Sequence, residues 1–158
     1  MPVKIINVTK YDQIMIGTRN TDGFLPGWGN DKVYGREGDD LFYDTKYNPP
    51  PASQKDDDLF VGGEGNDKFT TVEGRDVMRG GAGDDFVSGY NSDSFVFRGM
   101  AGEDTINIDT ADAEDFNLVQ ISENHSRLVS IDGEQTINLF GVENITFQHM
   151  NADTDPAI

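Results

Sequence analysis

The chain lacks several of the residue types and motifs on which common functions depend. It has no cysteine among its 158 residues, which excludes disulfide bonds and thiol nucleophiles. Its only histidines, His125 and His149, have no second histidine nearby, so a zinc site is not expected. Neither an HExxH nor a GxSxG motif is present, and no apolar run approaches the roughly 18 residues of a membrane helix. These absences argue against a zinc enzyme, a serine hydrolase and an inserted membrane protein.

Basic residues are scarce as well. The 12 lysines and arginines stand against 29 aspartates and glutamates, which gives a formal net charge of −17. So acidic a chain repels nucleic-acid phosphates and anionic membrane surfaces, whereas it attracts hard divalent cations such as calcium. The first residues also lack the apolar core and cleavage site of a classical signal peptide, which leaves export through a C-terminal signal open.

Glycine and aspartate, in contrast, recur at a fixed spacing. Residues 62–70 (GGEGNDKFT) and 80–88 (GGAGDDFVS) both follow the pattern GGxGxDxUx, in which U is a large apolar residue. Steps of nine from Gly62 place nonads at residues 17, 26, 35, 44, 53, 62, 71, 80 and 89, and one inserted residue, Arg98, precedes the last nonad at Gly99. The sixth position is aspartate in eight of these ten nonads, the exceptions being Pro49 and Ser94. The eighth position is apolar in nine of them: Phe24, Val33, Phe42, Phe60, Phe69, Met78, Val87, Val96 and Ile106. A flexible acidic linker needs no such register.

Each position of a nonad has a mechanical role. Glycine at positions 1, 2 and 4 permits the positive φ angles and close approach of a tight turn. The last three residues suit a short strand whose middle side chain points inward. Stacked turns bring the aspartates together, and their carboxylates repel each other unless a cation lies between them.

Over residues 17–107 the sequence resembles the RTX family of secreted bacterial proteins. The resemblance implies an all-β fold, a right-handed parallel β-roll in which two nonads make one turn. It also implies calcium between turns, held by aspartate carboxylates and turn carbonyls. The metal ligands carried over by register are Asp22, Asp31, Asp40, Asp58, Asp67, Asp76, Asp85 and Asp104, with the turn glycines Gly29, Gly38, Gly63, Gly65, Gly81, Gly83 and Gly102.

Strict alternation of the nonads sorts these aspartates into two rows. One row is expected to contain Asp22, Asp40, Asp58, Asp76 and then Ser94, and the other Asp31, Pro49, Asp67, Asp85 and Asp104. The complete steps are 22/40, 40/58, 58/76, 67/85 and 85/104, which predicts about five calcium ions. The segment DTKYNPPPA at 44–52 is expected to bulge from the roll and to interrupt the second row between Asp31 and Asp67.

The predicted organisation is an N-terminal cap strand at 1–16, the roll at 17–107 with 44–52 as an irregular nonad, and a C-terminal β cap at 108–147. A tail at 148–158 is a candidate secretion signal. Within the cap, alternation predicts strands at Phe116–Ile121, Leu128–Ile131 and Gln135–Phe140, with a turn at Asp132-Gly133. The segment LFGVENITF at 139–147 resembles the part that closes many rolls of this family.

The seventh and ninth positions are expected to face outward. One outer face then collects Leu41, Leu59, Val77 and Phe95 together with Tyr43, Val61 and Phe97. A face this apolar predicts burial under the chain's own C-terminal segment, with a partner or self-association as the alternative. On the other face Lys32, Lys68 and Tyr34 are either contacts for an anionic polysaccharide or scattered solvated side chains.

Two function classes remain open. The first is a calcium-dependent folding and secretion module, unfolded in the low-calcium cytosol and folded outside the bacterial cell. The second is a binding module for anionic polysaccharide, similar to the repeat modules of alginate epimerases. An adhesin or ice-binding segment is a third and weaker alternative, and the lack of a regular threonine array on either outer face argues against ice binding. In each class the chain is an ancillary module and not itself an enzyme, and its partners are calcium, a polysaccharide or another domain of a larger protein.

Overall fold

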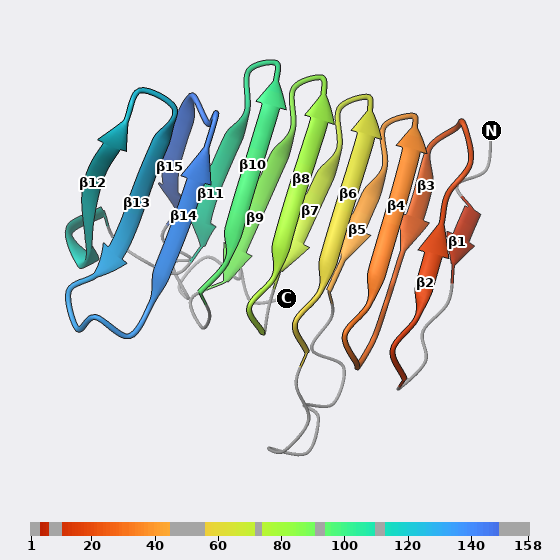
Figure 1. The fold of residues 1–158 in the computed structure, drawn as a ribbon, viewed down its shortest axis with the longest axis horizontal. Coiled ribbons are helices and arrows are strands. Elements are labelled where there is room, and N and C mark those ends of the chain that lie inside the picture. Colours follow the sequence, from red (N-terminus) through yellow and green to blue (C-terminus); the bar gives the residue numbers. More distant parts are fainter. Residues whose placement is uncertain are drawn as a thin grey trace, which may run out of the picture.

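The chain folds into two sheets between which the backbone passes back and forth (Figure 1). This computed structural model describes residues 4–6, 11–44, 56–71, 74–90, 94–109 and 113–148. Nearly every regular element is a strand, and neighbouring strands of the repeat region run parallel. The predicted all-β, parallel β-roll is therefore confirmed. Within the described ranges, no helix is long and apolar enough to cross a bilayer.

The two sheets differ in size and contain alternate passes of the chain. Sheet I has seven strands in the order β1-β3-β5-β7-β9-β11-β15, and sheet II has eight in the order β12-β13-β14-β10-β8-β6-β4-β2. The strands are β1 Lys4–Ile6, β2 Ile14–Ile16, β3 Asp22–Phe24, β4 Lys32–Glu37, β5 Leu41–Tyr43, β6 Leu59–Glu64, β7 Lys68–Thr71, β8 Val77–Ala82, β9 Phe86–Tyr90, β10 Val96–Ala101, β11 Thr105–Asp109, β12 Phe116–Ser122, β13 His125–Ser130, β14 Thr136–Phe140 and β15 Asn144–Gln148. A short 3-10 helix, Ala113–Asp115, precedes β12.

The core is a stack of the eighth-position side chains. Eight of those predicted are at most 1% exposed: Phe24, Val33, Phe42, Phe60, Phe69, Met78, Val87 and Ile106. Along sheet I the rings of Phe24 and Phe42 lie 5.0 Å apart and those of Phe42 and Phe69 lie 4.6 Å apart, measured between centroids. Burying one such side chain contributes about 1.5–3 kcal/mol, so the ladder supplies most of the apolar driving force for the roll.

The strand register corrects the predicted alternation around the triproline segment. Phe42 pairs with Phe69 and Val33 with Phe60, 27 residues apart in sequence, whereas elsewhere in the repeats the usual offset is two nonads. The connection from β5 to β6 thus contains nine residues more than the coil needs. The prolines of this nonad cannot donate the hydrogen bonds of a ladder, and the register of the described strands passes over it. Strict alternation is therefore wrong beyond Tyr43, although residues 45–55 themselves lie outside the described ranges.

The register also moves by one residue before β10. Phe97, not Val96, pairs with Met78 and is fully buried, while Val96 points outward and is half-buried. Arg98 pairs with Arg79 and is therefore a regular ninth-position residue, so the prediction that Arg98 is the inserted residue is wrong. Phe95, which is 3% exposed, now precedes the strand where other repeats carry aspartate. A one-residue slip exchanges the faces of a strand, and this one buries two aromatic rings in place of one valine.

Additional strands extend the coil at both ends. At the N-terminal end, β2 pairs with β4 and buries Met15 opposite Val33, so the segment before Gly17 contributes a further rung. At the other end β14 pairs in parallel with β10, β15 pairs in parallel with β11, and the β12–β13 hairpin widens sheet II. The described C-terminal strands thus extend the two sheets, and the expectation that they cover an outer face is wrong.

Candidate functional site

The sixth-position aspartates form two rows, one beside each sheet. Row one consists of Asp22, Asp40, Asp67, Asp85 and Asp104, and row two of Asp31, Asp58 and Asp76. All of these side chains are at most 3% exposed. The neighbours 22/40, 58/76, 67/85 and 85/104 agree with the predicted rows. The neighbours 40/58 were predicted wrongly, because the displaced nonad makes 40/67 and 31/58 adjacent instead. Row two is not interrupted after Asp31, and it ends before Phe95, so Ser94 is not a member.

In every row aspartate except Asp22, one carboxylate oxygen is held by the backbone of the preceding rung. In Asp22, Oδ2 accepts instead from the N–H and hydroxyl of Thr18 in its own turn. The N–H of Asp22 donates to Oδ1 of Asp40 at 2.7 Å, and the N–H of Asp40 donates to Oδ1 of Asp67 at 2.8 Å. In row two, the N–H of Asp58 donates to Oδ1 of Asp76 at 2.9 Å. These bonds fix the rotation of each carboxylate, so the second oxygen has a defined direction.

That second oxygen has no partner in seven of the eight aspartates. The unpaired buried atoms are Oδ1 of Asp22 and Oδ2 of Asp31, Asp40, Asp58, Asp67, Asp85 and Asp104. In Asp76 the corresponding oxygen accepts a hydrogen bond from the Thr71 hydroxyl. A buried carboxylate oxygen without a partner is costly, and a bound cation removes the cost. A repeated orphan of this kind is the feature expected of a cation site.

Backbone carbonyls converge on the same places. A Cβ built on Gly62 lies 2.0 Å from Oδ2 of Asp67 and 2.7 Å from the carbonyl oxygen of Gly80. A Cβ built on Gly35 lies 2.1 Å from Oδ2 of Asp40 and 2.7 Å from the Gly62 carbonyl oxygen. A side chain at either position would displace these oxygens, so glycine is required there for lack of space.

The predicted turn glycines have the conformation that their role demands. Gly63 and Gly65 adopt φ angles of 126° and 129°, which L side chains rarely adopt. The other predicted glycines also have positive φ: Gly29, Gly38, Gly81, Gly83 and Gly102. Their roles as carbonyl donors to a metal stay a prediction.

Burial also changes the acidity of the row aspartates. Desolvation, reinforced by neighbouring carboxylates, raises the pKa of Asp31 and Asp40 to about 6 and of Asp67 and Asp85 to about 7. The pKa of Asp58 rises to about 9, and that of Asp76 rises well above its ordinary value, both mainly through desolvation. Among the described residues no basic side chain forms an ion pair with a row aspartate. The rows therefore lack a positive charge that a divalent cation can supply.

The donor set indicates which metal fits. Only carboxylate and carbonyl oxygens are available, which suits hard cations, and Ca²⁺ takes six to eight such ligands in flexible geometry. No cluster of three or more acidic or histidine side chains suited to a metal occurs among the described residues. At Gly35 and Gly62 a row carboxylate instead lies beside a turn carbonyl, and hydrogen bonds along each row place one aspartate next to the following one.

A second ladder, at the fifth position, was missed by sequence reasoning. Oδ1 of Asp39 accepts the N–H of Asn66 at 2.8 Å, and Oδ1 of Asn66 accepts the N–H of Asp84 at 2.9 Å. These side chains are exposed and fasten one turn to the next. The available signal was the recurrence of Asn or Asp just before the sixth-position aspartate, at residues 30, 39, 57, 66 and 84.

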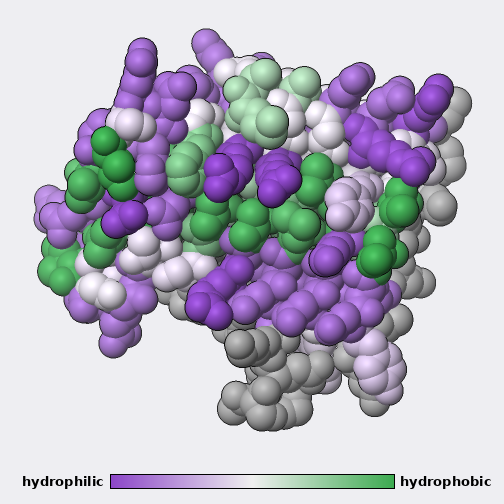
Figure 2. Space-filling model, in the orientation of Figure 1, coloured by the Kyte–Doolittle hydropathy of each residue, from purple (hydrophilic) through white to green (hydrophobic). Residues whose placement is uncertain are grey.

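The outer face of sheet II carries an apolar band bordered by arginines. Leu59, Val77 and Val96 lie side by side and half-buried, and Figure 2 shows hydrophobic side chains gathered across this face. The predicted grouping of residues into two outer faces was wrong. The displaced nonad places Lys32 and Tyr34 on sheet II, and it places Leu41, Tyr43 and Lys68 on sheet I.

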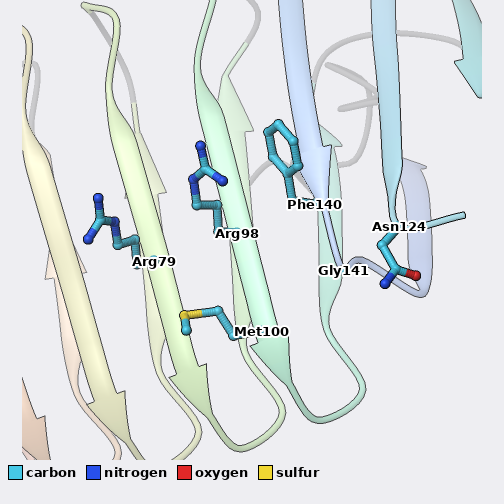
Figure 3. Close-up of a pocket in the computed structure, with 6 residues that line it drawn as sticks. All are labelled: Arg79, Arg98, Met100, Asn124, Phe140 and Gly141. Atoms are coloured by element: carbon cyan, nitrogen blue, oxygen red, sulfur yellow. The ribbon is translucent and has the colours of Figure 1, made fainter. Parts of the chain in front are cut away.

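Next to this band, where the cap meets the repeats, lies an open hollow of about 450 Å³. Figure 3 shows Arg79, Arg98 and Met100 on β8 and β10, with Phe140 beside Arg98. The Arg98 guanidinium lies 4.3 Å from the centroid of the Phe140 ring, and the His125 ring stacks on the same phenyl group at 4.1 Å. In the described part of the chain, neither Arg79 nor Arg98 has a carboxylate within ion-pair distance.

Comparison with known proteins agrees with the repeat geometry. The family described as the RTX calcium-binding nonapeptide repeat (4 copies) matches residues 27–43, 55–87 and 70–93. The matched segments include the turns of Asp31, Asp40, Asp58, Asp67, Asp76 and Asp85. No curated protein is significantly similar to the chain.

Proposed function

Because the chain carries the nonapeptide repeats of the RTX calcium-binding family, we propose that it is a module that folds when calcium binds between its turns. Such repeats are structural calcium-binding elements and not catalytic ones, so the role proposed here is an ancillary one. The observation that carries the proposal is the set of seven buried row carboxylates with an oxygen that lacks a partner.

The geometry supports a definite arrangement of ions. The corrected rows contain six aspartate–aspartate steps: 22/40, 40/67, 67/85, 85/104, 31/58 and 58/76. One ion per step would add twelve positive charges and bring the formal charge from −17 to −5. Relief of self-repulsion on this scale makes the binding free energy of calcium part of the folding free energy.

A calcium titration followed by far-ultraviolet circular dichroism tests this function. With excess chelator we expect a coil-like spectrum, and millimolar calcium should restore the β-sheet signal in a cooperative transition. Identical spectra and melting temperatures with and without calcium would exclude calcium-driven folding.

The extracellular setting is part of the same proposal. A calcium affinity that is too weak for binding in the cytosol, but sufficient for full binding at extracellular calcium, would couple folding to export. The candidate secretion signal at 148–158 begins with the last residue of β15, and residues 149–158 lie outside the described ranges. Deleting 149–158 should abolish export in a host with a matching transporter and leave calcium-induced folding intact. Undiminished export of the truncated chain would exclude a signal in this segment.

The hollow beside Phe140 favours a second candidate function, the binding of an anionic polysaccharide. Two guanidinium groups without carboxylate partners lie on adjacent strands of an otherwise acidic molecule, and Arg98 is held in place by the Phe140 ring. Paired guanidinium groups suit the carboxylates of uronic acid residues.

Affinity electrophoresis through a polyuronate gel at constant calcium tests this second candidate. The double variant Arg79→Gln, Arg98→Gln should lose retardation, whereas the matched control Arg19→Gln, Arg75→Gln should keep it. The control arginines are exposed and already pair with Glu37 and Asp57. Equal retardation of both variants would exclude the hollow as the polysaccharide site.

A further inference from the structure

The C-terminal cap continues row one with a residue that does not belong to any nonad. The N–H of Asp104, the last row aspartate, donates to Oε2 of Glu143 at 2.8 Å. This is the bond that Asp85 makes to Oδ1 of Asp104 and that Asp67 makes to Oδ1 of Asp85, each at 2.9 Å. Glu143 thus takes the place of the next aspartate in the row.

The backbone of the cap repeats the rest of the turn. A Cβ built on Gly99 lies 2.2 Å from the Gly141 carbonyl oxygen, and the equivalent carbonyl above Gly62 belongs to Gly80. The N–H of Asn144 donates to the Asp104 carbonyl at 3.0 Å, as the N–H of Thr105 does to the Asp85 carbonyl at 2.9 Å. β15 then pairs with β11 exactly where a further repeat strand would lie (Figure 1).

The two turns differ in length, which accounts for the change of residue type. Six residues, 99–104, lie between Arg98 and Thr105, whereas only Gly141, Val142 and Glu143 lie between their strand partners Phe140 and Asn144. In the shorter turn the backbone of Glu143 cannot follow the path of a sixth-position aspartate. The additional methylene group of glutamate lets its carboxylate reach the same row.

An orphaned atom points to a ligand at this place. Asp104 is 0% exposed, and its Oδ2 has no hydrogen-bond partner. A Cβ built on Gly99 lies 1.9 Å from that oxygen, so Oδ2 and the Gly141 carbonyl face the same small space. The buried Asp104 carboxylate and the Gly141 carbonyl therefore face each other, and the exposed carboxylate of Glu143 lies beside them on the Asp104 N–H.

We infer that Asp104, Glu143 and the Gly141 carbonyl hold one further calcium ion, which fastens the C-terminal cap to the last repeat. The inference rests on the proposed calcium binding of the repeats but adds a site outside the nonapeptide pattern. Docking of the cap then depends on calcium directly, and the exposed edge of the last repeat closes only when the roll is loaded.

Calcium counting with an isosteric variant tests the inference. Glu143→Gln keeps an oxygen that accepts the Asp104 N–H and removes only the charge. The matched control is Glu134→Gln, which makes the same charge change at an exposed residue of the turn before β14. By calorimetry with calcium alone, Glu143→Gln should bind one ion fewer than the unaltered protein and Glu134→Gln should bind the same number.

The outcomes separate the two proposals. An unchanged ion count in Glu143→Gln overturns the cap site and leaves the repeat sites intact, whereas absence of binding in the unaltered protein overturns the function itself. If Glu143→Gln does not fold in calcium, crystals of the unaltered protein grown with calcium decide the question. An anomalous calcium peak between Asp104 and Glu143 supports the site, and its absence beside an occupied 85/104 step overturns it.

Discussion

At the scale of single residues, the two carboxylate oxygens of seven of the eight row aspartates have different surroundings, one hydrogen-bonded and one without a partner. Oδ1 of Asp67, for example, accepts the N–H of Asp40, while Oδ2 has no partner and lies beside Gly62. The first contact joins neighbouring rungs through the backbone and requires no metal. Burial of the second oxygen costs free energy unless a cation binds to it. Removing the side chain therefore destabilises the roll both in the presence and in the absence of calcium, by different amounts.

The cost of losing a row aspartate should depend on its place in the row. Asp58 belongs to the steps 31/58 and 58/76, whereas Asp22 belongs only to 22/40. At calcium about 100 times the dissociation constant, each lost site costs roughly 3 kcal/mol, so Asp58→Ala should destabilise about twice as much as Asp22→Ala. Chemical denaturation in calcium measures both, with exposed Glu64→Ala as a charge-matched control. Equal losses for the two aspartates would contradict the row assignment.

Without calcium, protons should stabilise the roll in place of the metal. The folded pKa values of about 6 for Asp40, 7 for Asp67 and 9 for Asp58 exceed the ordinary value near 4, so the folded state binds protons more tightly than the unfolded state. The resulting stabilisation is complete below about pH 4 and is lost as the pH rises through these folded values. In excess chelator the β-sheet signal should therefore be larger at pH 5 than at pH 8. Asp58→Asn should flatten this dependence, and a signal that grows with pH would contradict it.

At the scale of elements, a nonad contributes to the roll only if it supplies a strand. The segment 44–52 occupies nine residues, yet β5 pairs with β7 and β4 with β6 as if it were absent. The coil therefore tolerates an insertion of a whole repeat length, because the strands before and after the insertion pair directly with each other.

Removal of nine residues from this connection should consequently preserve the fold. Deleting 45–53 joins Asp44 to Gln54 and leaves six residues between Tyr43 and Leu59, the length of the turn from Gly62 to Asp67. We expect an unchanged ion count and an equal or slightly higher melting temperature in calcium, since loop closure costs less. Deleting the true nonad 62–70 is the length-matched control, because it removes Phe69 and sends every later strand to the other sheet. A melting temperature lowered equally by both deletions would show that 45–53 makes essential contacts.

The same elements show where sequence reasoning succeeded and where it failed. The spacing of Asp67 and Phe69 identified the turn and the inward side chain, because both are set by one short repeat. The exchange of row partners after Tyr43 was not predictable from counting. An extra segment of nine residues leaves the position of every later residue within its nonad unchanged. Around Val96 apolar residues flank the strand on both sides, so alternation alone could not choose which ring is buried. Glu143 escaped notice because its turn is three residues long and its carboxylate is one methylene further from the backbone.

At the scale of the whole molecule, the chain is a one-dimensional stack in which every rung depends on its neighbours. Every row carboxylate except that of Asp22 is fixed by the preceding rung, and the apolar ladder is buried only when both sides are stacked. Loss of the cations affects all rows at once and exposes the formal charge of −17. We therefore expect one cooperative expansion of the molecule and no stepwise loss of single rungs.

The radius of gyration measures this expansion directly. For a chain of 158 residues, a compact fold corresponds to about 15 Å and an unfolded chain to about 42 Å. Small-angle X-ray scattering should report a value near the larger figure in excess chelator and one near the smaller in millimolar calcium. Magnesium at the same concentration should not compact the chain, because Mg²⁺ loses its water reluctantly and demands octahedral geometry that paired carboxylates and turn carbonyls do not impose. Monovalent salt screens exposed charges but cannot occupy the orphaned oxygens, so sodium chloride of equal ionic strength should leave the chain expanded. Compaction by magnesium or by sodium chloride alone would mean that charge screening, and not coordination within the turns, drives the folding.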